Sequence, residues 1–181
     1  MTQAILLALT VFGLPVSAQA NESIDVKKRC YDMSAVACEV FHRTNEQRKK
    51  NRLPALNYSK RCFAMAQEQS EDMASRDYFS HTRPTSRKQR GETFSQRAQR
   101  FGLPWAGENI ANTQGGAAQA VTMWMNSPGH RRNILNRDYT SFAVGFRDGL
   151  YTQVFTKDAG RDAVVQLQDE ELPAETTDSS Y

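Results

Sequence analysis

The sequence lacks several features that define large protein classes. It has only three cysteines among 181 residues, so it is not a small domain stabilised by many disulfides. Its longest apolar run, Ile5–Val16, is shorter than the ~20 residues that cross a bilayer, and no second run reaches membrane length. The composition also excludes collagen, a coiled coil and a wholly disordered chain. We therefore expect one globular domain of ordinary size.

The first 20 residues carry no ionisable side chain. The apolar run leads into Ser17-Ala18-Gln19-Ala20, small residues in the A-x-A pattern that signal peptidases cleave. We interpret residues 1–20 as a signal peptide cut before Asn21, although its leading region has no Lys or Arg; a buried N-terminal helix is the alternative. No cysteine follows the predicted cut, which argues against a lipid anchor there. The protein is expected to be exported, periplasmic or extracellular, without a transmembrane segment.

Charge is unevenly distributed behind a formal net charge of +3. Residues 161–181 hold six acidic side chains and one base, a net charge of −5, which leaves +8 for residues 21–160. The acidic segment is predicted to be a flexible tail. A group of basic residues follows the second predicted helix: Arg87, Lys88, Arg90, Arg97 and Arg100. Because no aromatic residues suited to stacking on bases interleave them, a solvated basic face is favoured over specific nucleic-acid binding.

The cysteines are Cys30, Cys38 and Cys62, an odd number that leaves one outside any intramolecular disulfide. On one straight helix, Cys30 and Cys38 would lie ~12 Å apart, whereas a disulfide needs roughly 4.4–6.8 Å between Cα atoms. Their pairing therefore requires a helix that begins after Cys30, which Ser34 as an N-cap would allow. Cys62 falls on an apolar helix face and is expected in the core. The absence of a Cys-x-x-Cys spacing disfavours a metal site built from the three cysteines.

The hydrophobic periodicity predicts helices first and a β-hairpin last. After a lead-in at 21–33, the domain is expected to span 34–160, with residues 82–92 as an exposed loop. The order of elements predicts an α+β fold with helices on a small antiparallel sheet. The expected helices cover 34–50, 59–78, 93–100, 117–126 and 128–135, and the expected strands 142–146 and 150–155 flank the turn Asp148-Gly149.

The three histidines are candidates for chemistry. His42 lies in the first predicted helix and is interpreted as a surface or boundary residue. His81 ends the second helix and His130 opens a helical turn, while Glu108 lies between them among small and apolar residues. These three residues form either a buried hydrogen-bonded network or a divalent-metal site with an open position for water. A serine nucleophile is disfavoured, because Ser80 lacks the Gly-x-Ser-x-Gly pattern.

Several motifs occur in the order typical of one family. They are Asn45-Glu46-Gln47-Arg48, Tyr78-Phe79-Ser80-His81, Gly107-Glu108-Asn109-Ile110-Ala111, the stretch from Trp124 to Leu135, and Val144-Gly145-Phe146 with Tyr151-Thr152-Gln153-Val154-Phe155. Over about residues 36–157 the chain resembles the CAP superfamily (SCP/TAPS: cysteine-rich secretory proteins, antigen 5 and pathogenesis-related 1), in its bacterial branch. The resemblance implies a three-layer α-β-α sandwich with a central groove.

In that family, two histidines and two acidic residues line the groove and can hold zinc or another divalent ion. By motif position, His81 matches the first histidine, Glu108 the first acid and His130 the second histidine. The second acid should fall between Trp124 and His130, but no Asp or Glu occurs there and Ser127 stands nearest. The resemblance therefore implies Zn²⁺ or another divalent cation on an incomplete set of ligands.

Neighbouring residues are expected to serve the fold. Gly107, without a Cβ, lets the backbone pass close to the groove while Glu108 turns inward. Asn133 is interpreted as a structural cap, with a hydrogen bond to a neighbouring strand as the alternative. Trp124 is expected to pack its helix on the sheet.

Members of the family are described as secreted binders of sterols or other lipids, as immune or virulence effectors, and in some cases as proteases. The favoured prediction is an exported, non-enzymatic binding or interaction module. Its groove, with His81, Glu108 and His130, would hold a small hydrophobic ligand such as a lipid, a peptide or glycan, or a divalent metal. The alternative is a metal-dependent hydrolase or peptidase with the same three candidate catalytic residues, Glu108 being a ligand or general base.

Overall fold

The computed structural model describes residues 30–85, 91–103 and 105–157. The predicted signal peptide (1–20), most of the lead-in (21–33), the acidic tail (161–181) and the basic residues Arg87, Lys88 and Arg90 lie outside these ranges. Within them, no helix combines the length and the apolar character needed to cross a membrane.

A four-stranded sheet forms the centre, with strand order β1-β3-β4-β2. The strands are β1 (Asn57–Tyr58), β2 (Ala106–Asn112), β3 (Ser141–Arg147) and β4 (Leu150–Thr156). The three long strands are antiparallel, as predicted: β4 pairs with β3 on one side and with β2 on the other. The short β1 joins β3 in parallel, so the complete sheet is mixed rather than purely antiparallel.

The predicted hairpin joins β3 to β4. Asp148 and Gly149 have φ values of 48° and 84°, the left-handed conformations of a type I′ turn. Strand β2 is absent from the predicted elements, because Gly107 to Ala111 are buried on both faces of the sheet. A strand buried on both faces shows no alternation of apolar and polar residues.

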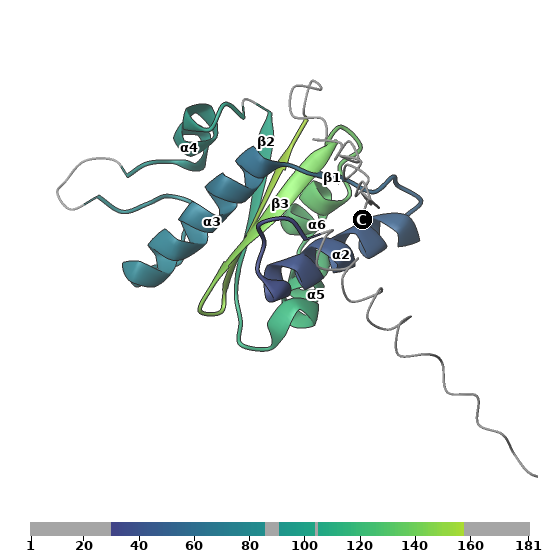
Figure 1. The fold of residues 1–181 in the computed structure, drawn as a ribbon, viewed down its shortest axis with the longest axis horizontal. Coiled ribbons are helices and arrows are strands. Elements are labelled where there is room, and N and C mark those ends of the chain that lie inside the picture. The colour runs from purple at the N-terminus through teal and green to yellow at the C-terminus, as the bar shows by residue number, and fades with distance from the viewer. Residues whose placement is uncertain (1–29, 86–90, 104, 158–181) are drawn as a thin grey trace, which may run out of the picture.

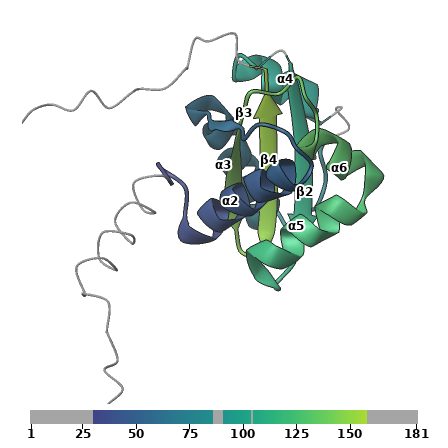
Figure 2. The same cartoon turned by 90° about the vertical axis from the view of Figure 1, so that its right-hand side faces the viewer.

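Helices cover both faces of the sheet. In the described residues they are α2 (Ala35–Lys50), α3 (Lys60–Ser75), α4 (Phe94–Arg100), α5 (Gly116–Asn126) and α6 (Pro128–Ile134). Figure 1 shows α3 and α4 on one side of the strands and α2, α5 and α6 on the other. Figure 2 looks onto this second group, with α2 and α5 in front of the sheet. The arrangement confirms the predicted three-layer α-β-α sandwich.

The helix starts agree with the sequence. The hydroxyls of Ser34, Ser59 and Thr93 each accept a hydrogen bond from the backbone N–H three residues later. Gln96 completes a capping box with Thr93 at the start of α4, and Gly102 follows the end of that helix with a φ of 67°. Such caps depend on a few neighbouring residues, so they are readable before the tertiary structure is known.

The Cys30–Cys38 pair forms a disulfide, with 5.3 Å between the two Cα atoms. Helix α2 begins after Cys30, as the spacing of the two residues requires. Cys62 is buried in α3, as predicted, and stays outside the disulfide.

Alternation along the strands decides which layer each side chain meets. In β4, Thr152 accepts a hydrogen bond from Ser70 of α3, whereas Gln153 donates one to Thr44 of α2. In β2, Glu108 pairs in register with Val154 and Asn109 with Gln153. Asn109 therefore faces the layer of α2, α5 and α6. The side chain of Glu108, the preceding residue, faces the layer of α3 and α4.

Trp124 packs α5 on the sheet, as predicted. Its side chain is 1% exposed, and its indole N–H donates to the carbonyl of Ile110 in β2 at 2.9 Å. The same layer is filled by the stacked rings of Phe41, Phe142 and Phe155. The sheet is thus held firmly against α2 and α5, which places its outer strand β2 between the flanking helices.

Candidate functional site

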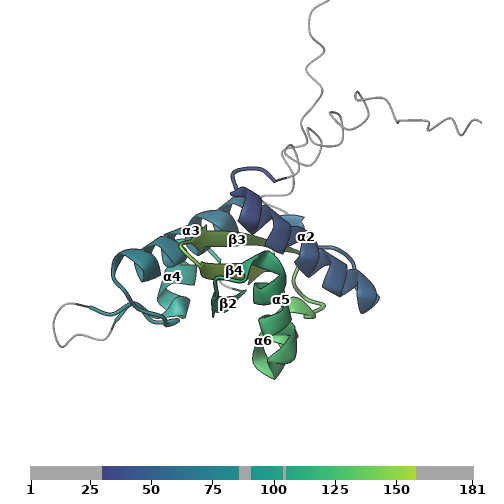
Figure 3. The same ribbon diagram turned by 90° about the horizontal axis from the view of Figure 1, so that it is seen from below.

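The predicted site residues come together around β2, the outermost strand of the sheet. Glu108 belongs to β2, His81 follows α3, and His130 lies in the first turn of α6. Figure 3 shows α4 and α6 on either side of β2. His81 contacts Glu108 directly, and His81 also acts electrostatically on His130.

The Glu108 carboxylate is buried and fully engaged. Its side chain is 1% exposed, and that of Arg97 is 0% exposed. Nη2 of Arg97 donates to Oε1 at 2.9 Å and to Oε2 at 2.8 Å, and Nδ1 of His81 lies 2.8 Å from Oε1. A buried carboxylate needs such compensation, because its desolvation costs several kcal/mol. Of the network considered for His81, Glu108 and His130, the structure shows the contact between His81 and Glu108, with Arg97 as a further partner.

The prediction that Arg97 belongs to a solvated basic face is wrong. Its guanidinium turns inward from α4, and Nη1 also donates to the carbonyl of His81 at 2.9 Å. Arg100, on the outer face of α4, remains partly exposed in ion pairs with Glu68 and Glu92. A pattern in the sequence could have revealed this: Arg97 lies on one helical stripe with the apolar or aromatic residues Phe94, Ala98 and Phe101.

Four contacts hold the segment that carries His81. Gln69 of α3 donates from Nε2 to the carbonyl of Ser80 at 2.9 Å, and Arg83 donates from Nε to Oε1 of Gln69 at 3.0 Å. Arg97 holds the carbonyl of His81, and Glu108 holds its Nδ1. The imidazole is 48% exposed, so Nε2 is the ring nitrogen left for a ligand.

Amide side chains hold the backbone at His130, whereas the buried guanidinium of Arg48 donates to the carbonyl of Ile134 at the other end of α6. Nδ2 of Asn109 donates to the carbonyl of His130 at 3.1 Å and to Oε1 of Gln153 at 3.0 Å. Gln153 in turn donates to the hydroxyl of Thr44 at 2.7 Å. This network runs from α2 through β4 and β2 to α6, and every partner along it is neutral.

Asn133 is not a helix cap. It forms hydrogen bonds to the neighbouring strand β2, which was the alternative considered for this residue. Its Nδ2 donates to the carbonyl of Glu108 at 3.2 Å and to Oδ1 of Asn109 at 2.9 Å. Gly107 permits this close packing, because a Cβ there would collide with the hydroxyl of Tyr139 and lie 3.2 Å from Oδ1 of Asn133. α6 is therefore tied directly to the strand that carries Glu108.

Burial lowers the pKa of His130 below its ordinary value of 6.5, and the nearby His81 lowers it further. The His130 imidazole is consequently neutral near pH 7. A neutral imidazole accepts a hydrogen bond or a metal ion through its unprotonated nitrogen.

Metal ligation by His81, Glu108 and His130 stays a prediction. Among the described residues, the group of three ligating side chains whose atoms all lie within 4.8 Å of one another is elsewhere in the molecule. Direct ligation by Glu108 would also require its carboxylate to exchange Arg97 for the ion. The contact between Nδ1 of His81 and Glu108 suits an orienting role for Glu108, because a carboxylate on one imidazole nitrogen directs the other nitrogen outward.

The domain matches a known family. Residues 41–156 fit the family model described as the cysteine-rich secretory protein family, CAP. The chain belongs to this family. The CAP domain thus accounts for almost all of the described residues beyond the start of α2.

Relatives and solved structures agree with this assignment. The uncharacterized protein YkwD of Bacillus subtilis (strain 168) is 37% identical over 127 residues, which are 68% of this chain and 48% of YkwD. The uncharacterized membrane protein YlbC of the same strain is 38% identical over 119 residues, 66% of this chain and 34% of YlbC. This CAP chain therefore spans less than half the length of these relatives.

Two solved structures share the fold. An extracellular protein containing a SCP domain from Bacillus anthracis str. Ames is 34% identical, with a TM-score of 0.63 over 73% of this chain and 43% of that protein. An outer surface protein from Borrelia burgdorferi shares the fold at 22% identity, with a TM-score of 0.56 over 65% of this chain and 89% of that protein.

Proposed function

We propose that this chain is an exported CAP-domain binding module that recognises a small ligand through His81 and His130. The observation that carries the proposal is the burial and neutralisation of Glu108 by Arg97. A general base must reach the proton that it removes, but the Glu108 side chain is 1% exposed and both carboxylate oxygens accept hydrogen bonds from Arg97. The chemistry that remains accessible beside β2 is therefore imidazole, which favours binding over hydrolysis.

Export is supported by the signal-peptide pattern at residues 1–20 and by the Cys30–Cys38 disulfide. Disulfides persist in oxidising compartments and are rare in the cytosol. The Bacillus anthracis relative is described as an extracellular protein, which is consistent with a periplasmic or extracellular location for this chain.

The ligand that we propose has an apolar body and a polar group. Two large aromatic side chains are exposed in the segments that carry the site: Phe79 at 50% and Trp105 at 72%. They precede His81 and Glu108 by two and three residues. An apolar body such as a lipid or an aromatic peptide side chain would gain from covering these rings, while the imidazoles bind the polar group.

A zinc centre is the second candidate, and the contact between Nδ1 of His81 and Glu108 supports it. His81 and His130 would hold the ion, and water would complete its coordination. A bound zinc ion would activate that water for hydrolysis. Bound zinc in the purified protein, and an activity lost both on chelation and in a Glu108→Ala variant that circular dichroism shows to be folded, would favour a hydrolase. Absence of binding at micromolar zinc would exclude it.

Native mass spectrometry of the exported protein, with metal analysis, tests the proposal. We expect wild type to carry an organic ligand or a metal ion that the His81→Ala/His130→Ala variant has lost. Lys49→Ala/Lys50→Ala, at the exposed end of α2, is the matched control and should keep it. Identical spectra for all three proteins would overturn the binding role of the two histidines.

A further inference from the structure

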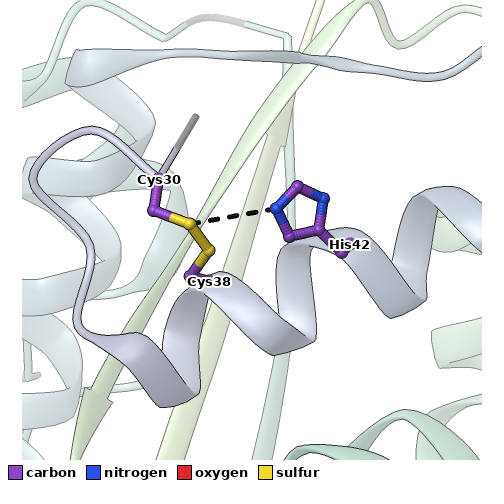
Figure 4. A group of neighbouring side chains, drawn as sticks. All are labelled: Cys30, Cys38 and His42. Atoms are coloured by element: carbon purple, nitrogen blue, oxygen red, sulfur yellow. Dashed lines mark hydrogen bonds between the residues drawn. A yellow bond between two sulfur atoms is a disulfide. The ribbon is translucent and has the colours of Figure 1, made fainter. Parts of the chain in front are cut away.

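A second group of ligand side chains lies at the start of α2 and shares no residue with the groove. It consists of Cys30, Cys38 and His42, whose sulfur and ring nitrogen atoms all lie within 4.8 Å of one another. Figure 4 shows the imidazole directed at the disulfide, with Nε2 of His42 3.8 Å from Sγ of Cys30.

The backbone brings these residues together without strain in the helix. Cys38 and His42 are four residues apart in α2, so their side chains share one face of the helix. Cys30 approaches from the preceding segment, which places its Cα 5.3 Å from that of Cys38. The ligand set is therefore one helical pair closed by a third side chain from a neighbouring loop.

The group also has access to solvent. Cys30 and Cys38 are themselves 7% and 4% exposed, and His42 is half-buried. A cleft of about 280 Å³ lies beside Cys38 and His42, and its other lining residues are Ala35, Glu39, Arg43 and Glu46. An ion or a small reductant in the cleft thus meets Cys38 and His42, and a fourth ligand to an ion can come from water there.

We propose that Cys30, Cys38 and His42 form a redox-controlled zinc site, closed by the disulfide and opened by its reduction. Two thiolates and one imidazole are donors that suit Zn²⁺, with water in the fourth position. Thiolates on a tetrahedral zinc ion lie about 3.8 Å apart, given Zn–S bonds of about 2.3 Å. Rotation of the two cysteine side chains reaches that separation while the backbone stays in place.

The redox step is balanced by a dithiol. A dithiol reductant supplies two electrons and two protons, its own sulfurs become a disulfide, and the Cys30–Cys38 bond is replaced by two thiols. Zinc binding then releases those two thiol protons to solvent. Oxidation by a disulfide of higher potential runs the same steps backwards and expels the ion.

Cobalt titration of the full-length protein tests the site. Co²⁺ replaces Zn²⁺ on thiolates and then absorbs in the near ultraviolet through thiolate-to-metal charge transfer, which imidazole ligands alone do not produce. The titration is run in the His81→Ala/His130→Ala background, so that the groove imidazoles contribute nothing. We expect one Co²⁺ per chain with charge-transfer absorption after reduction by a dithiol that is then removed by gel filtration, and none before it.

Variants then assign the ligands. Cys30→Ser, Cys38→Ser and His42→Ala should each weaken or abolish the charge-transfer band of the reduced protein. Glu46→Gln is the matched control, because it changes a side chain of the same cleft and leaves the three ligands in place. Circular dichroism of each variant shows whether it is folded.

A second measurement on wild type covers the case in which a cysteine variant fails to fold. Zn²⁺ should protect Cys30 and Cys38 of the reduced wild-type chain from alkylation, as read by peptide mass spectrometry. A folded, reduced protein that shows neither cobalt charge transfer nor protection by zinc would overturn the proposal. So would an unchanged cobalt spectrum in a folded His42→Ala variant, since the site would then not include the imidazole.

Discussion

Adjacent residues of β2 support the two histidines of the groove in different ways. Glu108 faces the α3–α4 side and holds His81 through a charged contact backed by Arg97. Asn109 faces the α2–α5–α6 side and holds the backbone of His130 through neutral amides. The charged support stabilises His81 only while both ions are present, because either one alone would be a buried, uncompensated charge. In the neutral support, a substitution removes only the hydrogen bonds of the residue that is changed and leaves no buried charge without a partner.

The largest effect should come from removing the acid. Glu108→Ala leaves the Arg97 guanidinium buried without its partner, so we expect a loss of about 3–5 kcal/mol in the free energy of unfolding. Urea denaturation measures it. Arg97→Met/Glu108→Leu should recover most of that loss, since the buried charge is then absent.

The matched control is Glu39→Gln, which breaks an exposed pair with Arg43 and should cost less than about 1 kcal/mol. Equal effects of Glu108→Ala and Glu39→Gln would contradict the charged support of His81.

Breaking the neutral support should cost less. Asn109→Leu removes the donor to His130 and Gln153 and strands a donor of Asn133, for which we expect a loss of about 1–3 kcal/mol in the free energy of unfolding. NMR should show the His130 resonances shifted and those of His81 unchanged. Asn112→Leu, at the exposed end of β2, should lie within about 0.5 kcal/mol of wild type. If His81 moves as much as His130 in Asn109→Leu, the two supports are not separate.

Removing His81 itself should barely affect stability. Its imidazole is 48% exposed, so water replaces it on Glu108 while Arg97 remains. We expect His81→Ala to cost less than about 1 kcal/mol and yet to lose the bound ligand in native mass spectrometry. A loss of stability comparable to that of Glu108→Ala would show that His81 is part of the core rather than of a binding surface.

The smallest effect concerns protonation of His130. Burial and His81 lower the pKa of His130 below 6.5, so the unfolded chain takes up this proton first as the pH falls. Stability contributed by the neutral form is complete above pH 6.5, decreases as the pH drops toward the folded pKa, and is then constant. Proton NMR titration measures the midpoint.

His81→Ala should return the midpoint of His130 part of the way toward 6.5, because burial remains while the neighbouring charge is gone. A wild-type midpoint at or above 6.5 would contradict both causes of the shift.

Much of the fold is encoded locally. Ser34, Ser59 and Thr93 cap their helices, and Asp148-Gly149 forms the hairpin turn, because each depends on residues within one turn of the chain. Strand β2 cannot be predicted from such local patterns, since its side chains are buried on both faces and its sequence lacks a strand-like alternation of apolar and polar residues.

The site is divided in the same way. His81, Glu108 and His130 are predicted together through the family motifs, whereas Arg97 and Asn109 are not assigned roles, although both hold the site. Arg97 could be recognised from its place on the inner stripe of α4, but its choice of Glu108 as partner depends on how α4 packs against β2. Asn109 shows no local pattern that distinguishes it from any other buried amide.

The sequence by itself determined the family, the ends of the helices, the hairpin and the three candidate site residues, His81, Glu108 and His130. Only the tertiary structure decided that Glu108 faces Arg97 while Asn109 faces His130, and that His42 lies against the Cys30–Cys38 disulfide. The physical reason is that capping and turns are energies of neighbouring residues. The partner of a buried charge, by contrast, is chosen by strand register and by which layer covers each face.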